Sequence, residues 1–262
     1  MGKSAAGSST RPSFILIGAS AGGYAALLRI FRDLPADFPG ALLIVVHIGE
    51  QATNWMPHRL TEAGQIPAKV AEHGERIRQG IAYLAPPGSH LMVRGGRVAL
   101  THGPREQHVR PAIDVLFRSG AREYGQRTIG LILSGMLRDG TIGLRAVRDA
   151  GGVTIVQDPE SAQSGEMPRN AMANLPVDYC LDVSEIGPTL DLMVRRAGRY
   201  RKGVLETGLA SSVRLMKHRA RLLAKLVEQS RGNPRTERFL RAEASALQKN
   251  IEAIQRMIPG GA

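Results

Sequence analysis

Phe14-Ile15-Leu16-Ile17-Gly18-Ala19-Ser20-Ala21-Gly22-Gly23 is a short apolar run followed by a cluster of small residues. The run ends at a glycine, which is typical of a buried strand. From Tyr24 to Phe31 the apolar residues recur at helical spacing. The stretch therefore predicts a sharp turn from strand to helix with Ser20 at the turn. Such a turn lifts the hydroxyl clear of the sheet and leaves the first helix N–H groups free for an anion.

A glycine-rich turn of this kind also occurs where dinucleotides bind. That site requires G-x-G-x-x-G, and Ser20 stands at the position of its middle glycine. It also requires an acidic residue at the end of the second strand, whereas the apolar run Ala41 to Val46 is followed by His47. On these residues alone, two other interpretations remain: a loop that binds phosphate, and a plain tight turn. A histidine in that place favours a serine nucleophile with a base.

Strand-like and helix-like segments alternate through the first three quarters of the chain, with short connections. This order predicts an α/β fold, a doubly wound and mostly parallel sheet of the Rossmann-like type. Gly95-Gly96 between two short apolar segments predicts a β-hairpin over residues 90–100. Pro111 is suited to open a helix at its first position, and a last helix of this region is predicted over Ile186 to Arg196.

The charge is divided unevenly along the 262 residues. The net charge is +12, but residues 1–194 hold 19 Lys and Arg against 18 Asp and Glu, whereas residues 195–262 hold 16 against 5. We therefore predict three parts: a flexible tail over residues 1–13, a catalytic domain over 14–198 and a basic helical extension over 199–262. The single cysteine, Cys180, excludes an internal disulfide, and no apolar run is long enough to cross a membrane, so we expect a cytoplasmic protein without membrane insertion.

The basic extension carries an apolar heptad stripe on each of two predicted helices. The stripes run from Leu209 to Val227 and from Leu240 to Ile258, with Gly232-Asn233-Pro234 between them. We expect a C-terminal helical hairpin, separable from the chemistry, that packs on itself or on the α/β domain; self-association through these helices is a further option. Nucleic-acid binding is disfavoured because Phe239 is the only Phe or Trp there to stack on bases.

Three residues with nucleophilic or ionisable side chains follow predicted strands: Ser20, His47 and Asp139. In an open α/β sheet, ligands bind beyond the carboxyl ends of the strands, and loops at one edge can bring these side chains together as nucleophile, base and orienting carboxylate. Each also has an ordinary structural interpretation. His47 could be a core histidine, and Asp139 could cap the next helix.

Six ordered motifs between about Ser13 and Val194 resemble the chemotaxis protein-glutamate methylesterase family (the CheB catalytic domain). They are GASAGG from Gly18, VVH ending at His47, VRPAIDVLF from Val109, SGMLRDG from Ser134, VQDPESA from Val156 and MPR from Met167. The resemblance implies that Ser20, His47 and Asp139 form the triad. It also implies that the backbone N–H of Met136, with one near Ala21, holds the oxyanion. The family usually has a glycine where this chain has Leu137.

What the resemblance implies is a serine hydrolase without metal or cofactor. Its substrate is the γ-glutamyl methyl ester on methylated chemoreceptor cytoplasmic helices, and some members deamidate glutamine. Thirteen residues before the domain are too few for the family's receiver domain, so a stand-alone form is expected. Two alternatives stay open: a catalytically idle adaptor that docks on receptors, and a nucleic-acid-binding module built on the basic helices.

Overall fold

The computed structural model describes residues 13–48, 55–195, 201–230 and 234–255. Within these ranges seven strands form one sheet, in which every pairing is parallel, and two more form an antiparallel hairpin. The order across the sheet is β3-β4-β2-β1-β7-β8-β9. The sheet strands are β1 (Phe14–Ala19), β2 (Ala41–Val46), β3 (Ala68–Val70), β4 (Ala82–Leu84), β7 (Thr128–Ile132), β8 (Val153–Gln157) and β9 (Tyr179–Leu181). The hairpin strands are β5 (His90–Arg94) and β6 (Arg97–Thr101), which confirms the turn at Gly95-Gly96.

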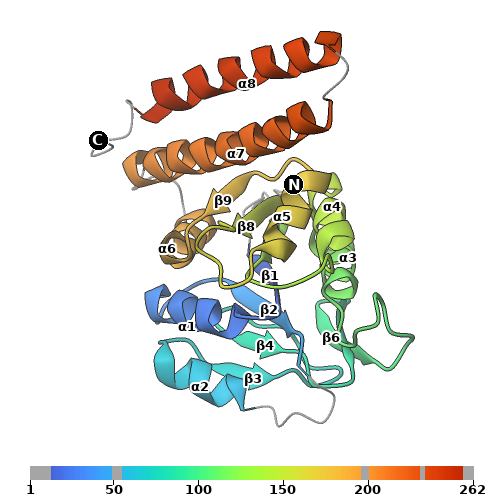
Figure 1. Ribbon diagram of the computed structural model, residues 1–262. Coiled ribbons are helices and arrows are strands. Elements are labelled where there is room, and N and C mark those ends of the chain that lie inside the picture. Colours follow the sequence, from blue (N-terminus) through green and yellow to red (C-terminus); the bar gives the residue numbers. More distant parts are fainter. Residues whose placement is uncertain (1–12, 49–54, 196–200, 231–233, 256–262) are drawn as a thin grey trace, which may run out of the picture.

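Helices cover both faces of the sheet (Figure 1). They are α1 (Gly23–Asp33), α2 (Met56–Ala63), α3 (Ile113–Tyr124), α4 (Thr141–Asp149), α5 (Glu166–Asn174) and α6 (Val183–Val194), with a short 3-10 turn, η1 (Gly125–Arg127). Helices α1, α2 and α6 pack on one face, and α3, α4 and α5 pack on the other. This arrangement confirms the predicted doubly wound α/β fold.

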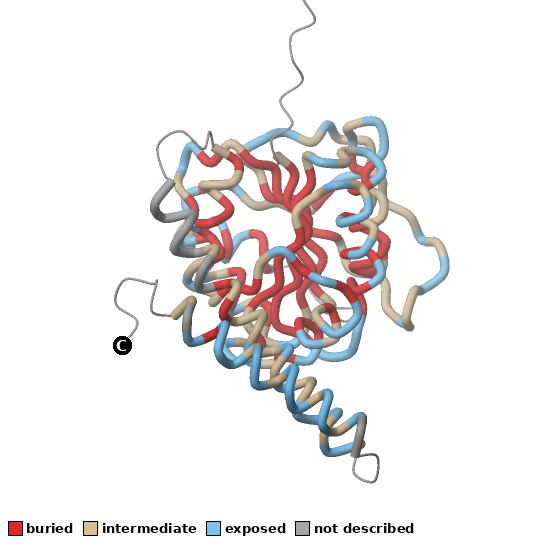
Figure 2. The backbone as a smooth tube through the Cα atoms, turned by 90° about the horizontal axis from the view of Figure 1, so that it is seen from above, coloured by how far each residue is buried: buried red, intermediate tan, exposed pale blue. Residues whose placement is uncertain are grey.

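Strand β1 explains why the central strands are apolar without interruption. Ile15 and Ile17 point into the core under α1 and α6, whereas Leu16 points into the core under α3. Both sets are fully buried, because a parallel sheet covered on both faces has no solvent side. The buried strands form the centre of the molecule in Figure 2.

Two predicted helix starts are wrong by a few residues. Helix α3 begins at Ile113, not at Pro111, because Ala112 is extended (φ −111°, ψ 138°) and forms the N-cap. Helix α6 begins at Val183, three residues before the predicted Ile186. There Asp182 accepts a hydrogen bond from the Ser184 N–H, and the Glu185 carboxylate accepts one from the Asp182 N–H. This capping box stabilises an earlier first turn.

The basic extension forms two long helices, α7 (Arg201–Gln229) and α8 (Pro234–Gln255). Helix α7 packs along the sheet edge at β9, and α8 packs on α7 (Figure 1). The sequence left two arrangements open for these helices. Helix α7 adopts one of them, packing on the α/β domain. The proposed boundary at residue 198, residues 1–12 of the predicted tail over 1–13 and the end of the second stripe at Ile258 lie outside the described residues. Within the described chain, no helix has the length and apolar character needed to cross a membrane.

Candidate active site

The ends of β1 and β2 bring Ser20 and His47 next to each other. Ala19 pairs with Val46 across the two parallel strands, and each candidate residue is the next one along its strand. Neighbouring strands lie about 4.8 Å apart, so the two residues leave the sheet side by side. The Ser20 N–H donates to the Ser134 carbonyl at 3.0 Å, which ties the serine to the loop that follows β7.

Asp139 comes from that same loop and contacts His47 directly. Its Oδ2 lies 2.8 Å from His47 Nε2. The carboxylate is 3% exposed, and it also accepts the N–H groups of Ile113 at 2.7 Å and Asp114 at 3.1 Å. These are the first two residues of α3, where a helix favours negative charge. Asp139 therefore faces α3 and His47, and Gly140, not Asp139, is the N-cap of α4.

This contact determines the role of each nitrogen of the His47 imidazole ring. With its Nε2–H donated to the Asp139 carboxylate, a neutral His47 has Nδ1 as its free acceptor. Among the described residues no hydrogen bond joins the Ser20 hydroxyl to the His47 ring. Such bonds are often formed only when substrate is bound. The structure thus joins two of the three candidate residues directly and brings the third to the adjacent strand end.

A second buried carboxylate lies behind the first. Asp114 accepts the Gly143 N–H at 2.6 Å and the Gln107 side-chain amide at 2.8 Å. The pKa of Asp114 is raised to about 6, chiefly by burial. The nearby charge of Asp139 acts in the same direction, and the hydrogen bonds from Gly143 and Gln107 act against it. Asp114 helps to hold together α3 and α4, and Asp139 lies between these two helices.

The loop from Ser134 to Gly140 is held by backbone conformation and by α5. Leu137 has φ 64°, in the left-handed region that glycine adopts without strain. The loop therefore holds a leucine in a backbone conformation that glycine would adopt more readily. Asn170 of α5 donates its amide to the Leu137 carbonyl at 2.6 Å, which fixes the loop in this form.

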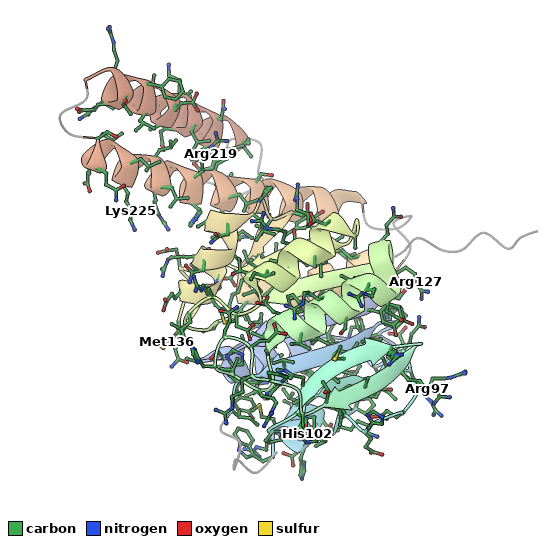
Figure 3. All side chains as sticks on the ribbon, turned by 90° about the vertical axis from the view of Figure 1, so that its right-hand side faces the viewer. Arg97, His102, Arg127, Met136, Arg219 and Lys225 are labelled. Atoms are coloured by element: carbon green, nitrogen blue, oxygen red, sulfur yellow. The ribbon has the colours of Figure 1, made fainter. Side chains whose placement is uncertain are left out.

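Two backbone N–H groups in the loops that meet at Ser20 have no acceptor among the described residues. They belong to Ala21, which follows Ser20, and to Met136; over the described residues neither donates to a protein acceptor. Met136 is 54% exposed and lies at the edge of the domain in Figure 3. Gly135 precedes Met136, and a Cβ placed on it would come within 3.0 Å of the Ser20 Cβ. The glycine therefore permits the close approach of the two loops.

A small cavity of about 170 Å³ opens beside His47. Its lining residues are His47, Ile48, Arg105, His108, Val109, Arg110 and Pro111. The two arginines give it a positive wall suited to carboxylate groups. In the described part of the chain, no group of three or more His, Cys, Asp or Glu side chains is placed to hold a metal ion.

Sequence reasoning missed the residues that hold the loops. Gln157 accepts the Ser134 N–H at 2.9 Å, the Ser134 hydroxyl donates to the Ala21 carbonyl at 2.7 Å, and Asn170 and Asp114 act as described above. All but Asn170 lie inside motifs that had been recognised. A polar residue inside an otherwise apolar run, such as Asp114 between Ile113 and Val115, was the available signal.

Proteins of similar sequence carry the name of methylesterases. The CheB methylesterase family matches residues 15–190. Protein-glutamate methylesterase/protein-glutamine glutaminase 2 of Anaeromyxobacter dehalogenans is 38% identical over 185 residues, which are 71% of this chain and 54% of the relative. A putative protein-glutamate methylesterase/protein-glutamine glutaminase of Leptospira interrogans is 38% identical over 173 residues, 66% of this chain and 90% of the relative.

A solved structure agrees with the sequence relatives. The crystal structure of the Thermotoga maritima CheB methylesterase catalytic domain superimposes with a TM-score of 0.66 at 33% identity, and the match covers 69% of this chain and 97% of that one. The matched part of this chain spans about half the length of several relatives, including 50% of a Geobacter metallireducens protein-glutamate methylesterase/protein-glutamine glutaminase. The names of these relatives give no support to an idle adaptor or a nucleic-acid-binding module. The fold, the ordered motifs and these matches together place the chain in the CheB methylesterase family.

Proposed function

We propose that this chain is a protein-glutamate methylesterase that uses Ser20 as nucleophile, His47 as base and Asp139 as the orienting carboxylate. The observation that carries the proposal is the hydrogen bond between His47 and a buried Asp139, next to the strand end that bears Ser20. A histidine held by a carboxylate beside a serine at a strand-to-helix turn is the arrangement required for acyl transfer.

The reaction begins when the Ser20 hydroxyl attacks the γ-carbonyl carbon of the methyl ester. Nδ1 of His47 takes the hydroxyl proton, and Asp139 stabilises the imidazolium through the Nε2–H. The N–H groups of Ala21 and Met136 donate to the oxyanion of the tetrahedral intermediate. The carbon–oxygen bond to methoxide breaks as His47 returns the proton, and methanol leaves.

Water then completes the cycle. It attacks the glutamyl ester on Ser20 while Nδ1 of His47 removes its proton, and the same proton returns to Ser20 Oγ as the acyl–oxygen bond breaks. The product is a free glutamate side chain. A glutamine side chain would follow the same route with ammonia as the leaving group, which is the deamidation named in the relatives.

Three features of the chain support this reaction. The Asp139 carboxylate already lies at the N-terminus of α3, so its charge needs little rearrangement when the imidazolium forms. The N–H groups of Ala21 and Met136 are free to donate within the described residues. The arginine-lined cavity beside His47 suits a substrate or product that carries carboxylates.

By analogy with the relatives, we propose methylated chemoreceptor cytoplasmic helices as the substrate and the cytoplasm as the site of action. The test is methanol release from a methylated receptor fragment. The wild-type chain should release methanol, and Ser20→Ala should abolish the release while the circular dichroism spectrum stays unchanged. A wild-type chain that leaves the methyl esters intact would contradict the proposed substrate.

A further inference from the structure

Helix α7 lies outside the residues that match the methylesterase family, yet it closes the open edge of the sheet. The Ser211 hydroxyl accepts the Cys180 N–H at 2.8 Å, and Arg214 donates to the Cys180 carbonyl at 3.1 Å. Ser211 is 1% exposed and Val213 is 6% exposed. Side chains of α7 therefore satisfy the backbone groups of β9 that another strand would otherwise pair.

The same helix face reaches the segment between β8 and α5, residues 158–165, which we call the β8–α5 loop. Arg214 lies 2.6 Å from the Glu185 carboxylate and 3.6 Å from Asp158, the first residue of the loop. About two turns further along α7, Arg221 lies 2.6 Å from Glu160 in the same loop. Arg169 of α5 lies 3.4 Å from the same oxygen of the Glu160 carboxylate.

The β8–α5 loop in turn holds the backbone next to the serine. The Ser164 N–H donates to the Ser134 hydroxyl at 2.9 Å, and the Gly135 N–H donates to the Ser164 carbonyl at 2.8 Å. Ser134 accepts the Ser20 N–H through its own carbonyl at 3.0 Å. A continuous path of hydrogen bonds and ion pairs therefore leads from the loop to the strand-to-helix turn.

The composition of the β8–α5 loop explains why it needs such support. Of its eight residues only Pro159 and Gly165 are buried, and Glu160, Ser161 and Gln163 are exposed. A loop with so little buried apolar surface is held chiefly by its polar contacts. The ion pairs among these contacts join the β8–α5 loop to α7 and to Arg169.

We propose that Arg214 and Arg221 are positioning residues for the nucleophile: they hold the β8–α5 loop, and through it the Ser134–Gly135 backbone that places Ser20. The inference rests on the proposed esterase function. It assigns α7 a role in the chemical step that the family-matched residues do not supply by themselves, and it replaces the expectation that the whole C-terminal extension is separable from the chemistry.

The test uses the full chain and a small γ-glutamyl methyl ester, so that docking of a protein substrate plays no part. Arg221→Ala should lower kcat about fivefold and leave KM within about twofold, because losing a charged contact of about 1 kcal/mol misplaces the nucleophile without touching the substrate. Arg214→Ala, which removes a less exposed ion pair, should lower kcat at least as much. Arg221→Lys should recover most of the loss.

Arg219→Ala is the matched control. It removes the same charge from the same helix, but Arg219 is 69% exposed and its ion pair is with Glu243 of α8, at 3.9 Å. Its kcat should equal that of the wild type. An equal loss of kcat in Arg219→Ala and Arg221→Ala would overturn the proposal, because the effect would then follow charge and not the loop contact.

Two further measurements separate positioning from general stability. In a Glu160→Ala background, Arg221→Ala should cause no additional loss of kcat, since its partner is gone; an undiminished loss would overturn the proposal. Amide hydrogen exchange at Gly135 and Ser164 should quicken in Arg221→Ala and stay unchanged in Arg219→Ala.

The exchange measurement also keeps the inference distinct from the proposed function. If the wild-type chain hydrolyses no ester, the proposed function fails, and the exchange rates alone decide whether α7 holds the loop. If Arg214→Ala does not fold, Arg221→Ala still decides, because its ion pair is exposed and its removal should leave the fold intact. Unchanged exchange and unchanged kcat in Arg221→Ala would overturn the proposal.

Discussion

The substitution Asp139→Asn best distinguishes the proposed catalytic role of the Asp139 carboxylate from its structural role at the start of α3. In the wild type, Oδ2 accepts from His47 and from the Ile113 N–H, and Oδ1 accepts from the Asp114 N–H. An asparagine offers one oxygen and one NH2 group to these three donors. If the NH2 group faces His47, it can bond only to an unprotonated Nε2. The ring proton then moves to Nδ1, and the base next to Ser20 is lost.

The opposite orientation keeps the correct tautomer but removes the charge that stabilises the imidazolium. Turnover should therefore fall on the order of 10⁴-fold, as in other triads that lose this carboxylate. Either orientation leaves one α3 N–H without an acceptor, which should cost about 1–3 kcal/mol of unfolding free energy. The fold should persist at that cost.

Two assays check this expectation. Steady-state hydrolysis of a small methyl ester measures turnover, and ¹⁵N chemical shifts of His47 report which ring nitrogen carries the proton. A loss of turnover below tenfold in a folded Asp139→Asn variant would refute the reasoning and leave Asp139 as an ordinary structural residue of its loop.

Three further predictions concern the residues around the site. The pKa of Asp114 is about 6 in the folded chain against 3.8 as its ordinary value, so the folded state binds this proton more tightly. The stabilisation that comes from protonated Asp114 is present below about pH 4 and is lost as pH rises through 6. In denaturant titrations, Asp114→Asn should remove about 3 kcal/mol of this pH dependence of the unfolding free energy. Leu137→Gly should raise stability by about 1 kcal/mol by relieving the left-handed backbone. Leu137→Ala, which keeps that strain, should not, and equal effects of the two would contradict the explanation. Burial raises the pKa of Cys180 to about 12, so iodoacetamide at pH 8 should alkylate it only after unfolding, and rapid labelling of the native chain would contradict this.

The sequence was sufficient for the mostly parallel sheet and for the positions of its central strands along the chain, because unbroken apolar runs such as Ala41–Val46 occur where both faces are covered. It also placed Ser20, His47 and Asp139 at strand ends, and parallel strands bring such ends to one edge. The roles that we propose for these three residues, for Ala21 and for Met136 rest on the hydrogen bonds at that edge.

What the sequence could not provide were contacts between distant segments. Nothing local to Arg214 indicates that it lies against Cys180, 34 positions earlier, because a heptad stripe looks the same whether the helix packs on a partner helix or on a sheet edge. The start of α3 was misplaced because Pro111 fits the first helical position equally well on propensity alone. The conformation of Leu137 was likewise hidden, since leucine is uncommon at positive φ.

Labelling by a serine-directed phosphonate tests the central claim most directly. The reagent bonds covalently only to a serine whose proton a neighbouring base removes, so tandem mass spectrometry of the labelled chain identifies the nucleophile. We predict one adduct, on Ser20, which His47→Ala prevents. An adduct on another serine, or none on Ser20 in a chain that hydrolyses the ester, would contradict the account.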